Sequence, residues 1–285
     1  MNEVVEEIER QWAEALSNTP LRRYSVPEER QREYWNKASS RYDNDASDVG
    51  AAYSNLLNSL IERGVVRPED RALDVGCGTG LFSIPLAKAV SSLTALDRSP
   101  AMLKALAAKT GGAMNLRTIS GDWELFRPDR KFELVFSSFC PAVYSLRSML
   151  RMEECSSRHC CIVALKDGSE PYFLHMAINR VTGDVFETTG LSLTYAKDML
   201  TALGREWGME TASMRSSLVG PADDIYNKFL DVLSMMLPMD QEKKNALRGM
   251  IDEHTSEGIF RFTVAKQVAA LHWRTPHLDG ERADG

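Results

Sequence analysis

Three glycines in the segment 76–80 could shape a turn around a ligand. Gly76, Gly78 and Gly80 follow the strand-like run 71–75, and helix-forming residues come directly after them. Because glycine lacks a Cβ, these positions can adopt backbone angles that other residues avoid, and the main chain can approach a ligand closely. The free N–H groups at the start of the next helix suit a negative group such as a carboxylate. The pattern predicts a nucleotide-like ligand at this turn.

A second strand-like run, 92–96, ends in Asp97. In doubly wound nucleotide-binding folds, an acidic residue about 20 positions after the glycines, at the end of the next strand, binds the ribose hydroxyls. The position of Asp97 after Gly76 agrees with that spacing. We therefore expect Asp97 to hold a ribose.

The spacing of the glycines separates two classes of cofactor. A dinucleotide site needs its third glycine three positions after the second, where this chain has Leu81, and Gly80 comes one position early. Asp74, just before the turn, would repel a pyrophosphate but attract an ammonium or sulfonium group. The residues favour a cofactor that is cationic at this end, and a nicotinamide oxidoreductase is the disfavoured alternative.

The motif Asp74-Val75-Gly76-Cys77-Gly78-Thr79-Gly80, followed by Leu96-Asp97, resembles the first two motifs of class I S-adenosylmethionine-dependent methyltransferases. The resemblance extends over roughly residues 30–270. It implies S-adenosyl-L-methionine as cofactor, with the glycine turn beside its methionine part and Asp97 on its ribose. The cofactor-binding residues that it implies in these motifs are Asp74, Gly76, Cys77, Gly78, Gly80 and Asp97.

The same resemblance extends the cofactor site to other segments. Arg98 and Met102 would flank the adenine, with core packing as the alternative for Met102. Asp122 would pair with the adenine amino group and Trp123 would cover a ring face, unless this pair forms a surface turn. Tyr42 would fold over the cofactor, or else serve as a core aromatic.

The loop after the strand-like run 132–136 should line the cleft between cofactor and acceptor. Ligands bind at the carboxyl ends of strands in open α/β sheets. We place Ser137 and Ser138 on the cofactor side. The acceptor-side candidates are Phe139, Cys140, Tyr144, Tyr172 and His175.

Two of these candidates also have plain structural explanations. Cys140 could be a reactive thiolate, but a small apolar cysteine is a common packing residue. His175 could be an exposed helix residue rather than a base. The loop lacks the Asn/Asp-Pro-Pro-Tyr/Phe motif of enzymes that methylate nucleic-acid bases, and we assign no catalytic base and no metal ligand.

Hydrophobic periodicity predicts the elements that carry these residues. The expected fold is α/β, a doubly wound Rossmann-like seven-stranded sheet whose last strand is antiparallel and lies between the fifth and sixth. Helices are predicted at 3–16, from Pro27, and at 49–63, 81–90, 100–109, 145–157, 172–180, 195–203 and 223–256. Strands are predicted at 71–75, 92–96, 114–120, 132–136, 159–165, 207–214 and 259–264.

The chain divides into three predicted parts. Residues 1–48 form an N-terminal helical cap, residues 49–270 the methyltransferase domain, and residues 271–285 a polar tail. Helical insertions are expected at about 168–194 and 221–256. The second is too apolar for a free arm, so it either roofs the substrate pocket or forms a homodimer contact.

Composition limits the classes of partner and the cellular location that we expect for this chain. With 285 residues and a formal charge of −6, the chain offers no general basic face for nucleic acid. No apolar run approaches the ~18 residues of a membrane span, and the first ten residues are acidic, so a cytoplasmic protein is expected. The five cysteines contain no C-x-x-C pair, which disfavours disulfides and zinc.

Together these observations predict an enzyme, a methyltransferase of the 2.1.1 class that transfers a methyl group to a small-molecule acceptor by in-line displacement. Two alternatives stay open: a non-catalytic scaffold that binds S-adenosylmethionine, and a protein methyltransferase.

Overall fold

Short apolar runs form the central sheet of the computed structural model, which describes residues 3–40, 42, 50–111, 115–166, 172–186 and 193–276. The predicted seven strands are present, and their order is β3-β2-β1-β4-β5-β8-β6. A two-residue strand, β7, is added at the edge of β8. The strands are β1 (Arg71–Val75), β2 (Ser92–Asp97), β3 (Leu116–Ser120), β4 (Phe132–Ser138), β5 (Ser156–Leu165), β6 (Trp207–Pro221), β7 (Thr255–Ser256) and β8 (Ile259–Arg274).

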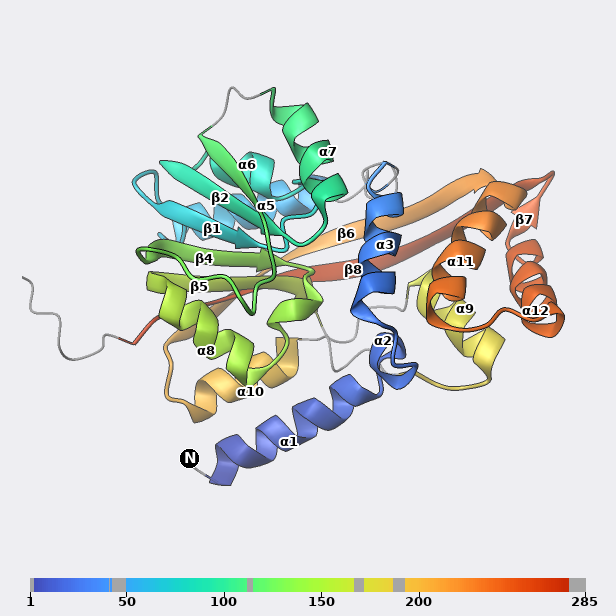
Figure 1. The fold of residues 1–285 in the computed structure, drawn as a ribbon, viewed down its shortest axis with the longest axis horizontal. Helices are drawn as coiled ribbons and strands as arrows, with labels where there is room; N and C mark the ends of the chain where they lie inside the picture. Colours follow the sequence, from blue (N-terminus) through green and yellow to red (C-terminus); the bar gives the residue numbers. More distant parts are fainter. Residues whose placement is uncertain are drawn as a thin grey trace, which may run out of the picture.

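The first five strands run parallel, and β8 is antiparallel to both β5 and β6. The chain builds outward from β1 to β3 and then returns to place β4 on the other side of β1 (Figure 1). Strand order therefore reverses between β1 and β4, as predicted. In such sheets the ligand site lies at the carboxyl ends of these two strands.

Helices cover both faces of the sheet (Figure 1). One buried cluster contains Trp12, Val135 and Cys160, and the opposite cluster contains Leu56, Phe82 and Cys161. The adjacent cysteines thus point to opposite faces, as expected of a buried strand. The helices are α1 (Glu3–Ser17), α2 (Pro20–Arg23), α3 (Glu28–Ala38), α5 (Gly50–Glu62), α6 (Ser83–Ala87), α7 (Pro100–Thr110), α8 (Leu146–Cys155), α9 (Phe173–Thr182), α10 (Leu193–Ala202), α11 (Ala222–Met236) and α12 (Gln241–Asp252).

The β6–β8 hairpin is longer than predicted. The sequence indicated strands at 207–214 and 259–264, whereas β6 continues to Pro221 and β8 continues to Arg274, into the range assigned to the polar tail. Exposed serine and arginine positions near residue 215 resemble a loop when read alone. They alternate with partly buried positions on the opposite face of the sheet, and backbone pairing with β8 keeps the strand extended.

The distal half of this hairpin carries a separate helical layer, here called the outgrowth: α9, α11 and α12 packed on residues 215–221 and 259–265 (Figure 1). Its core includes Phe173 from α9, Phe229 from α11, Leu247 from α12 and Phe260 from β8. The apolar face of the 221–256 insertion is therefore buried against the chain itself.

Three smaller elements also differ from the sequence prediction. Helix α6 spans only Ser83–Ala87, shorter than the predicted 81–90, and Pro85 lies in its first turn, where a proline is tolerated. Helix α2 was not predicted, and β5 begins at Ser156 rather than at His159. The predicted start of the third strand, Met114, lies outside the described residues.

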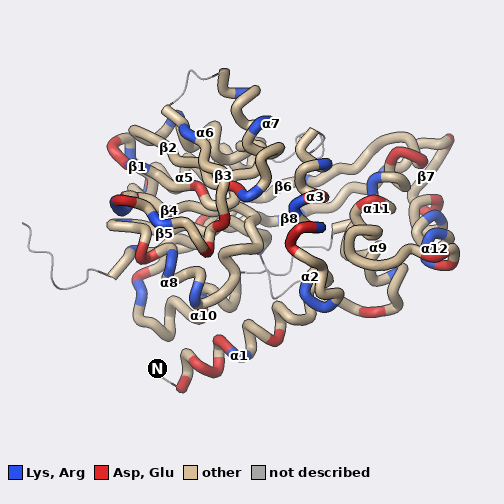
Figure 2. The backbone as a smooth tube through the Cα atoms, in the orientation of Figure 1, with Lys and Arg blue, Asp and Glu red and all other residues tan. Residues whose placement is uncertain are grey.

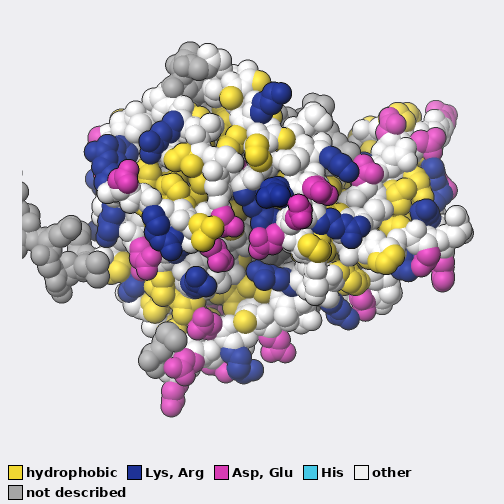
Figure 3. Space-filling view, viewed as in Figure 1, with side chains coloured by type: hydrophobic (Ala, Val, Ile, Leu, Met, Phe, Trp, Pro, Cys, Tyr) yellow, Lys and Arg dark blue, Asp and Glu magenta, His cyan; other side chains and the backbone are white. Residues whose placement is uncertain are grey.

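Charged side chains of both signs are interspersed over the face seen in Figure 3, and the tube in Figure 2 shows the same mixture along the elements. Among the described residues, no helix combines the length and the apolar character needed to cross a bilayer.

Candidate functional site

The turn after β1 is built from three glycines with left-handed backbones. The φ angles of Gly76, Gly78 and Gly80 are 73°, 53° and 88°. A Cβ on Gly76 would lie 2.3 Å from Cys140 Sγ, and one on Gly80 would lie 2.2 Å from Leu106 Cδ1. A Cβ on Gly78 would meet no atom within 4 Å. Glycine is thus required at positions 76 and 80 because a side chain there would clash with neighbouring residues. At Gly78 the backbone instead borders open space.

The Asp97 carboxylate is hydrogen-bonded to this turn. The Gly78 N–H donates a hydrogen bond of 2.9 Å to Asp97 Oδ2, and the Ser99 N–H donates one of 2.8 Å to Oδ1. Burial raises the pKa of this carboxyl, although the two backbone hydrogen bonds oppose the rise. Each carboxylate oxygen has two acceptor sites, so Asp97 can still accept from ligand hydroxyls.

Asp74 supplies a buried carboxyl below the turn. Its side chain is 1% exposed, and the Ser83 hydroxyl donates to Oδ2 at 2.5 Å. Within the described residues, Oδ1 is buried without a hydrogen-bond partner. Burial raises the pKa of Asp74 to about 7, and the neighbouring Asp97 contributes to the rise. A cation brought close to Oδ1 would satisfy it and favour the ionised form.

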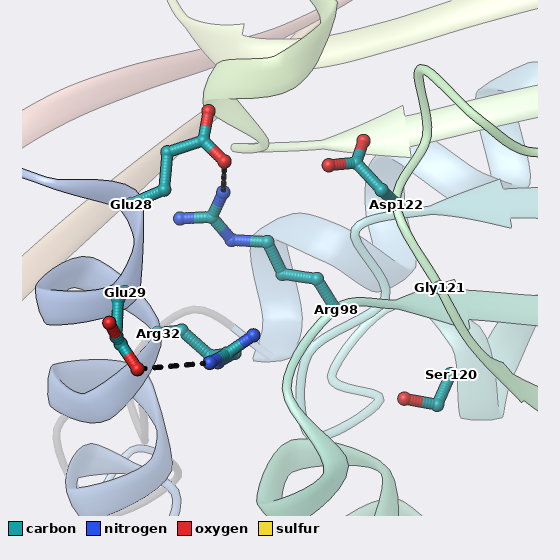
Figure 4. Close-up of a pocket in the computed structure, with 7 residues that line it drawn as sticks. All are labelled: Glu28, Glu29, Arg32, Arg98, Ser120, Gly121 and Asp122. Atoms are coloured by element: carbon teal, nitrogen blue, oxygen red, sulfur yellow. Dashed lines mark ion pairs between the residues drawn. The ribbon is translucent and has the colours of Figure 1, made fainter.

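A hollow of about 470 Å³ lies between α3 and the ends of β2 and β3 (Figure 4). Arg98 projects into it and reaches Glu28 Oε2 at 3.9 Å, and the Asp122 carboxylate faces it from the end of β3. Two predicted residues from different loops, Arg98 and Asp122, are thus brought together. Sequence reasoning missed the α3 side of this hollow, formed by Glu28, Glu29 and Arg32.

Met102 and Trp123 lie in the core rather than in this hollow. Met102 is 3% exposed on α7, in agreement with the packing alternative. Trp123 is 4% exposed, its indole N–H donates to the Ser148 hydroxyl at 2.8 Å, and the Arg151 guanidinium covers its ring. Neither side chain is among those that line the hollow.

The loop after β4 closes against the glycine turn. Ser137 is buried, and its hydroxyl donates to the Val75 carbonyl at 2.8 Å, which ties β4 to β1. Phe139 has a φ of 50°, a conformation rare for a bulky residue and often found at functional sites. Ser138, between them, is half-buried.

Cys140 packs on Gly76, and burial raises the pKa of its thiol to about 12. The thiol therefore stays protonated at neutral pH. This favours the packing role over a reactive thiolate, because the thiolate is the nucleophilic form.

The acceptor candidates separate into two groups. Tyr144 is 6% exposed within the core cluster of Trp12. Tyr172 and His175 instead lie together at the start of α9, with ring centroids 6.1 Å apart. Burial is the main cause of the raised pKa of Tyr172, and the nearby Tyr42 hydroxyl contributes to it. Tyr42 therefore lies close to this group.

Two further residues of this group were missed by sequence reasoning. Tyr53 on α5 neighbours Tyr42 and Tyr172, and Lys266 on β8 lies over the Tyr172 ring. The available signal was Lys266 itself, a charge at an inward position of an alternating strand pattern.

A family profile described as "Methyltransferase domain" matches residues 72–156, which run from β1 to the start of β5. Residues 72–156 thus resemble a methyltransferase domain, in agreement with the predicted resemblance to class I S-adenosylmethionine-dependent methyltransferases. The matched segment contains the glycine turn, Asp97, Asp122 and the 137–140 loop.

The curated relatives match only part of this chain. Malonyl-acyl-carrier-protein O-methyltransferase 1 of Ilyobacter polytropus is 31% identical over 40% of this chain and 42% of its own. A demethylmenaquinone methyltransferase of Staphylococcus aureus is 41% identical over 26% of this chain and 32% of its own. The chain thus spans less than half the length of these curated relatives.

Two solved structures show the same fold. Magnesium protoporphyrin IX methyltransferase from Synechocystis PCC 6803, crystallised with bound SAH, has a TM-score of 0.51 at 14% identity, over 84% of this chain and 96% of its own. The YcgJ protein from Bacillus subtilis has a TM-score of 0.50 at 15% identity, over 78% of this chain and 98% of its own.

A larger hollow of about 660 Å³ lies at the opposite edge of the sheet. It is lined by the first residues of β1 to β4, namely Arg71, Ser92, Leu116 and Phe132. Since ligands in this topology bind at the carboxyl ends of strands, this hollow is not the cofactor site.

Proposed function

We propose that this protein uses S-adenosyl-L-methionine to methylate a small-molecule acceptor. The observation that carries the proposal is the joining of Asp97 to the open glycine of the turn through the Gly78 N–H. A carboxylate that can bind ribose hydroxyls, next to a glycine without a side chain, suits an adenosyl group. The ligand can approach the backbone there because no side chain is in the way.

The residues present fit this cofactor at both ends. Asp97 would hold the ribose hydroxyls, while Arg98 and Asp122 would border the adenine in the hollow beside α3. Asp74, with its unsatisfied buried oxygen, would face the cationic methionine end, where a pyrophosphate would be repelled. The bound SAH of the Synechocystis enzyme and the methyltransferase names of the sequence relatives support the same assignment.

S-adenosyl-L-methionine supplies a methyl group already activated on a sulfonium, so the protein has to provide orientation and exclusion of water. Phe139 and Tyr53, with ring centroids 6.2 Å apart, form an apolar wall next to the turn. This wall would keep water from the methyl group and guide the acceptor lone pair into line with it. We assign no general base to the chain.

Calorimetric titration with S-adenosylhomocysteine tests the cofactor half of the proposal. Gly78→Ala places a methyl group in the open space where we expect the ligand, and Gly111→Ala is its matched control. Gly111 also has a positive φ, 58°, and open space around it, but it caps the C-terminal end of α7 and is not part of the turn.

Both variants should lose a similar free energy of unfolding, about 1 kcal/mol, for the left-handed backbone. Only Gly78→Ala should weaken S-adenosylhomocysteine binding, by about tenfold or more. Equal binding by the two variants would contradict our placement of the cofactor.

Transfer itself is tested with methyl-labelled S-adenosylmethionine and fractionated cell extract. Label in the small-molecule fraction is the expected outcome. Label in the protein fraction would instead favour a protein methyltransferase, and cofactor binding without any transfer would favour a scaffold.

A further inference from the structure

The larger hollow, at the amino ends of β1 to β4, concentrates positive charge. We call it the amino-end hollow. Among the described residues that line it are four arginines, Arg71, Arg117, Arg127 and Arg130, and one carboxylate, Asp129. The hollow beside α3 has the opposite balance, with three carboxylates and two guanidiniums. Because the whole chain has a formal charge of −6, the amino-end hollow is a local basic site on an acidic protein.

Two of these arginines are held in position by oxygens that carry no charge. The Arg117 Nε–H donates to the Thr94 hydroxyl at 2.9 Å. Arg127 donates from one terminal nitrogen to the Glu124 and Phe126 carbonyls, both at 2.9 Å. Hydroxyl and carbonyl oxygens orient a guanidinium without neutralising it. Its other N–H groups keep the fork geometry that binds phosphate or carboxylate oxygens.

Ion pairing neutralises only part of the charge in the amino-end hollow. Within the part of the chain that the structure describes, Arg71 is the one arginine of the four that forms an ion pair, with Glu133 at 3.3 Å. The other three guanidiniums repel one another in the free protein, and an anion bound between them would relieve this repulsion. Several uncompensated cations favour a ligand with more than one negative charge.

Part of the lining is apolar. Ile119, Phe126 and Pro128 are half-buried, and the Arg71 guanidinium lies over the buried Phe132 ring, with 5.8 Å from Cζ to the ring centroid. The volume of about 660 Å³ is within the size range of small-molecule sites. Cations beside an apolar surface suit a ligand that has an anionic end and an apolar or aromatic body.

The amino-end hollow is separate from the proposed site of methyl transfer. Strand β1 begins in this hollow at Arg71 and ends at Val75, just before the glycine turn. Five residues of extended strand put roughly 15 Å between these two ends. A ligand in the amino-end hollow would therefore be neither the cofactor nor the methyl acceptor, and its binding would not require methyl transfer.

We propose that the amino-end hollow binds an organic diphosphate or triphosphate. Its phosphate groups accept charge-assisted hydrogen bonds from Arg117, Arg127 and Arg130. Its apolar or aromatic body lies against Ile119 and Phe126. A monocarboxylate would leave most of the positive charge uncompensated. A nucleic-acid strand fits less well, because charges of both signs cover the face seen in Figure 3.

The test is calorimetry on the full-length protein in buffer with EDTA, with and without S-adenosylhomocysteine. GTP is compared with guanosine, and geranyl diphosphate with geraniol, since the members of each pair differ only in their phosphate groups. At least one phosphate ester should bind about tenfold or more tightly than its alcohol. Raising sodium chloride from about 50 mM to about 200 mM should weaken that binding several-fold, because salt screens exposed charges.

Arg117→Gln/Arg130→Gln removes two exposed cations of the hollow and should weaken binding of the preferred phosphate ester by about tenfold or more. Arg215→Gln/Arg261→Gln is the matched control, since these exposed arginines lie on the β6–β8 hairpin and the net charge changes equally. It should change the affinity by no more than about twofold. Arg117→Lys/Arg130→Lys keeps the charge but loses the guanidinium fork, and should retain part of the affinity.

Circular dichroism verifies the folding of each variant. Arg127→Gln/Arg130→Gln, with the same expected loss of affinity, is the second route if the first pair does not fold. The proposal is overturned if neither phosphate ester is preferred over its alcohol, or if the variants of the hollow keep the parental affinity. It is also overturned if the control pair weakens binding equally, or if S-adenosylhomocysteine displaces the phosphate ester, which would place that ligand in the proposed cofactor site.

Discussion

The cofactor half of the site and the acceptor half are assembled in different ways. Gly78 and Asp97 lie on consecutive βα turns and hydrogen bond directly. Tyr53 lies on α5, Tyr172 directly precedes α9 and Lys266 lies on β8, so these residues come from segments far apart in the sequence. The residues predicted to bind the cofactor thus form a local motif, whereas those predicted to face the acceptor meet through long-range packing.

The core of the sheet and the outgrowth differ in the burial of their ion pairs. In the core, Arg205 donates to Glu153 at 2.8 and 3.0 Å, and the Trp273 indole N–H donates to the same carboxylate at 3.0 Å. In the outgrowth, Arg180 and Glu253 join α9 to α12 with both side chains about half exposed. The core thus contains a largely buried ion pair, whereas the ion pair of the outgrowth is exposed to solvent.

The largest expected effect concerns the ribose site. Asp97→Ala should weaken S-adenosylhomocysteine binding by at least about 100-fold, because two hydrogen bonds to a charged acceptor contribute about 1.5–3 kcal/mol each. Glu28→Ala, which removes only an exposed pair with Arg98 across the hollow, should change the affinity by no more than about threefold. Calorimetry on both variants, with circular dichroism to verify folding, makes the comparison. An Asp97→Ala variant with parental affinity would place the ribose elsewhere.

The contrast between the two ion pairs predicts the next effect. Arg205→Met leaves the Glu153 carboxylate, 8% exposed, buried without its cation and should cost about 3–5 kcal/mol of unfolding free energy. Arg180→Met, the control in the outgrowth, should cost less than about 1 kcal/mol. Urea denaturation measures both. Similar losses in the two variants would refute the view that the two regions are stabilised differently.

Sequence reasoning succeeded where chemistry and proximity along the chain coincide. The turn at Gly76 to Gly80, the strand ending in Asp97 and the loop after β4 could all be predicted, because each is a short strand followed by its own turn. The strand order also followed from the resemblance, down to β8 between β5 and β6. The roles of these residues toward the cofactor remain predictions.

Sequence reasoning failed where contacts with residues far along the chain decide where a side chain lies. Trp123 follows Asp122 at a strand end, but Ser148 and Arg151 on α8 draw its ring into the core. Lys266 was overlooked because the predicted strand 259–264 ended two residues before it, so its inward position on β8 was not recognised. The homodimer predicted through residues 221–256 stays a prediction, although the apolar face that suggested it is buried within the outgrowth.

The smallest expected effect is on the pH dependence of the free energy of unfolding, and it compares Asp74 near the glycine turn with His175 on α9. The native pKa of Asp74, about 7, lies above its ordinary 3.8, so between these values the native state holds a proton that the unfolded state has lost. Stability due to Asp74 therefore falls as pH rises from about 4 to about 7. The native pKa of His175, about 4, lies below its ordinary 6.5, so its contribution rises with pH over nearly the same range.

These opposite slopes should partly cancel in the parent protein and separate in single variants. Asp74→Asn should gain roughly 1–3 kcal/mol relative to the parent between pH 5 and pH 7, because it removes the cost of ionising a buried carboxyl. His175→Asn should show the reverse, a smaller gain of stability over that interval than the parent shows. Urea denaturation at half-unit pH steps measures the differences. If the Asp74→Asn difference did not vary with pH, the Asp74 carboxyl would titrate at the same pH in the native and unfolded states, and its pKa would not be raised by burial.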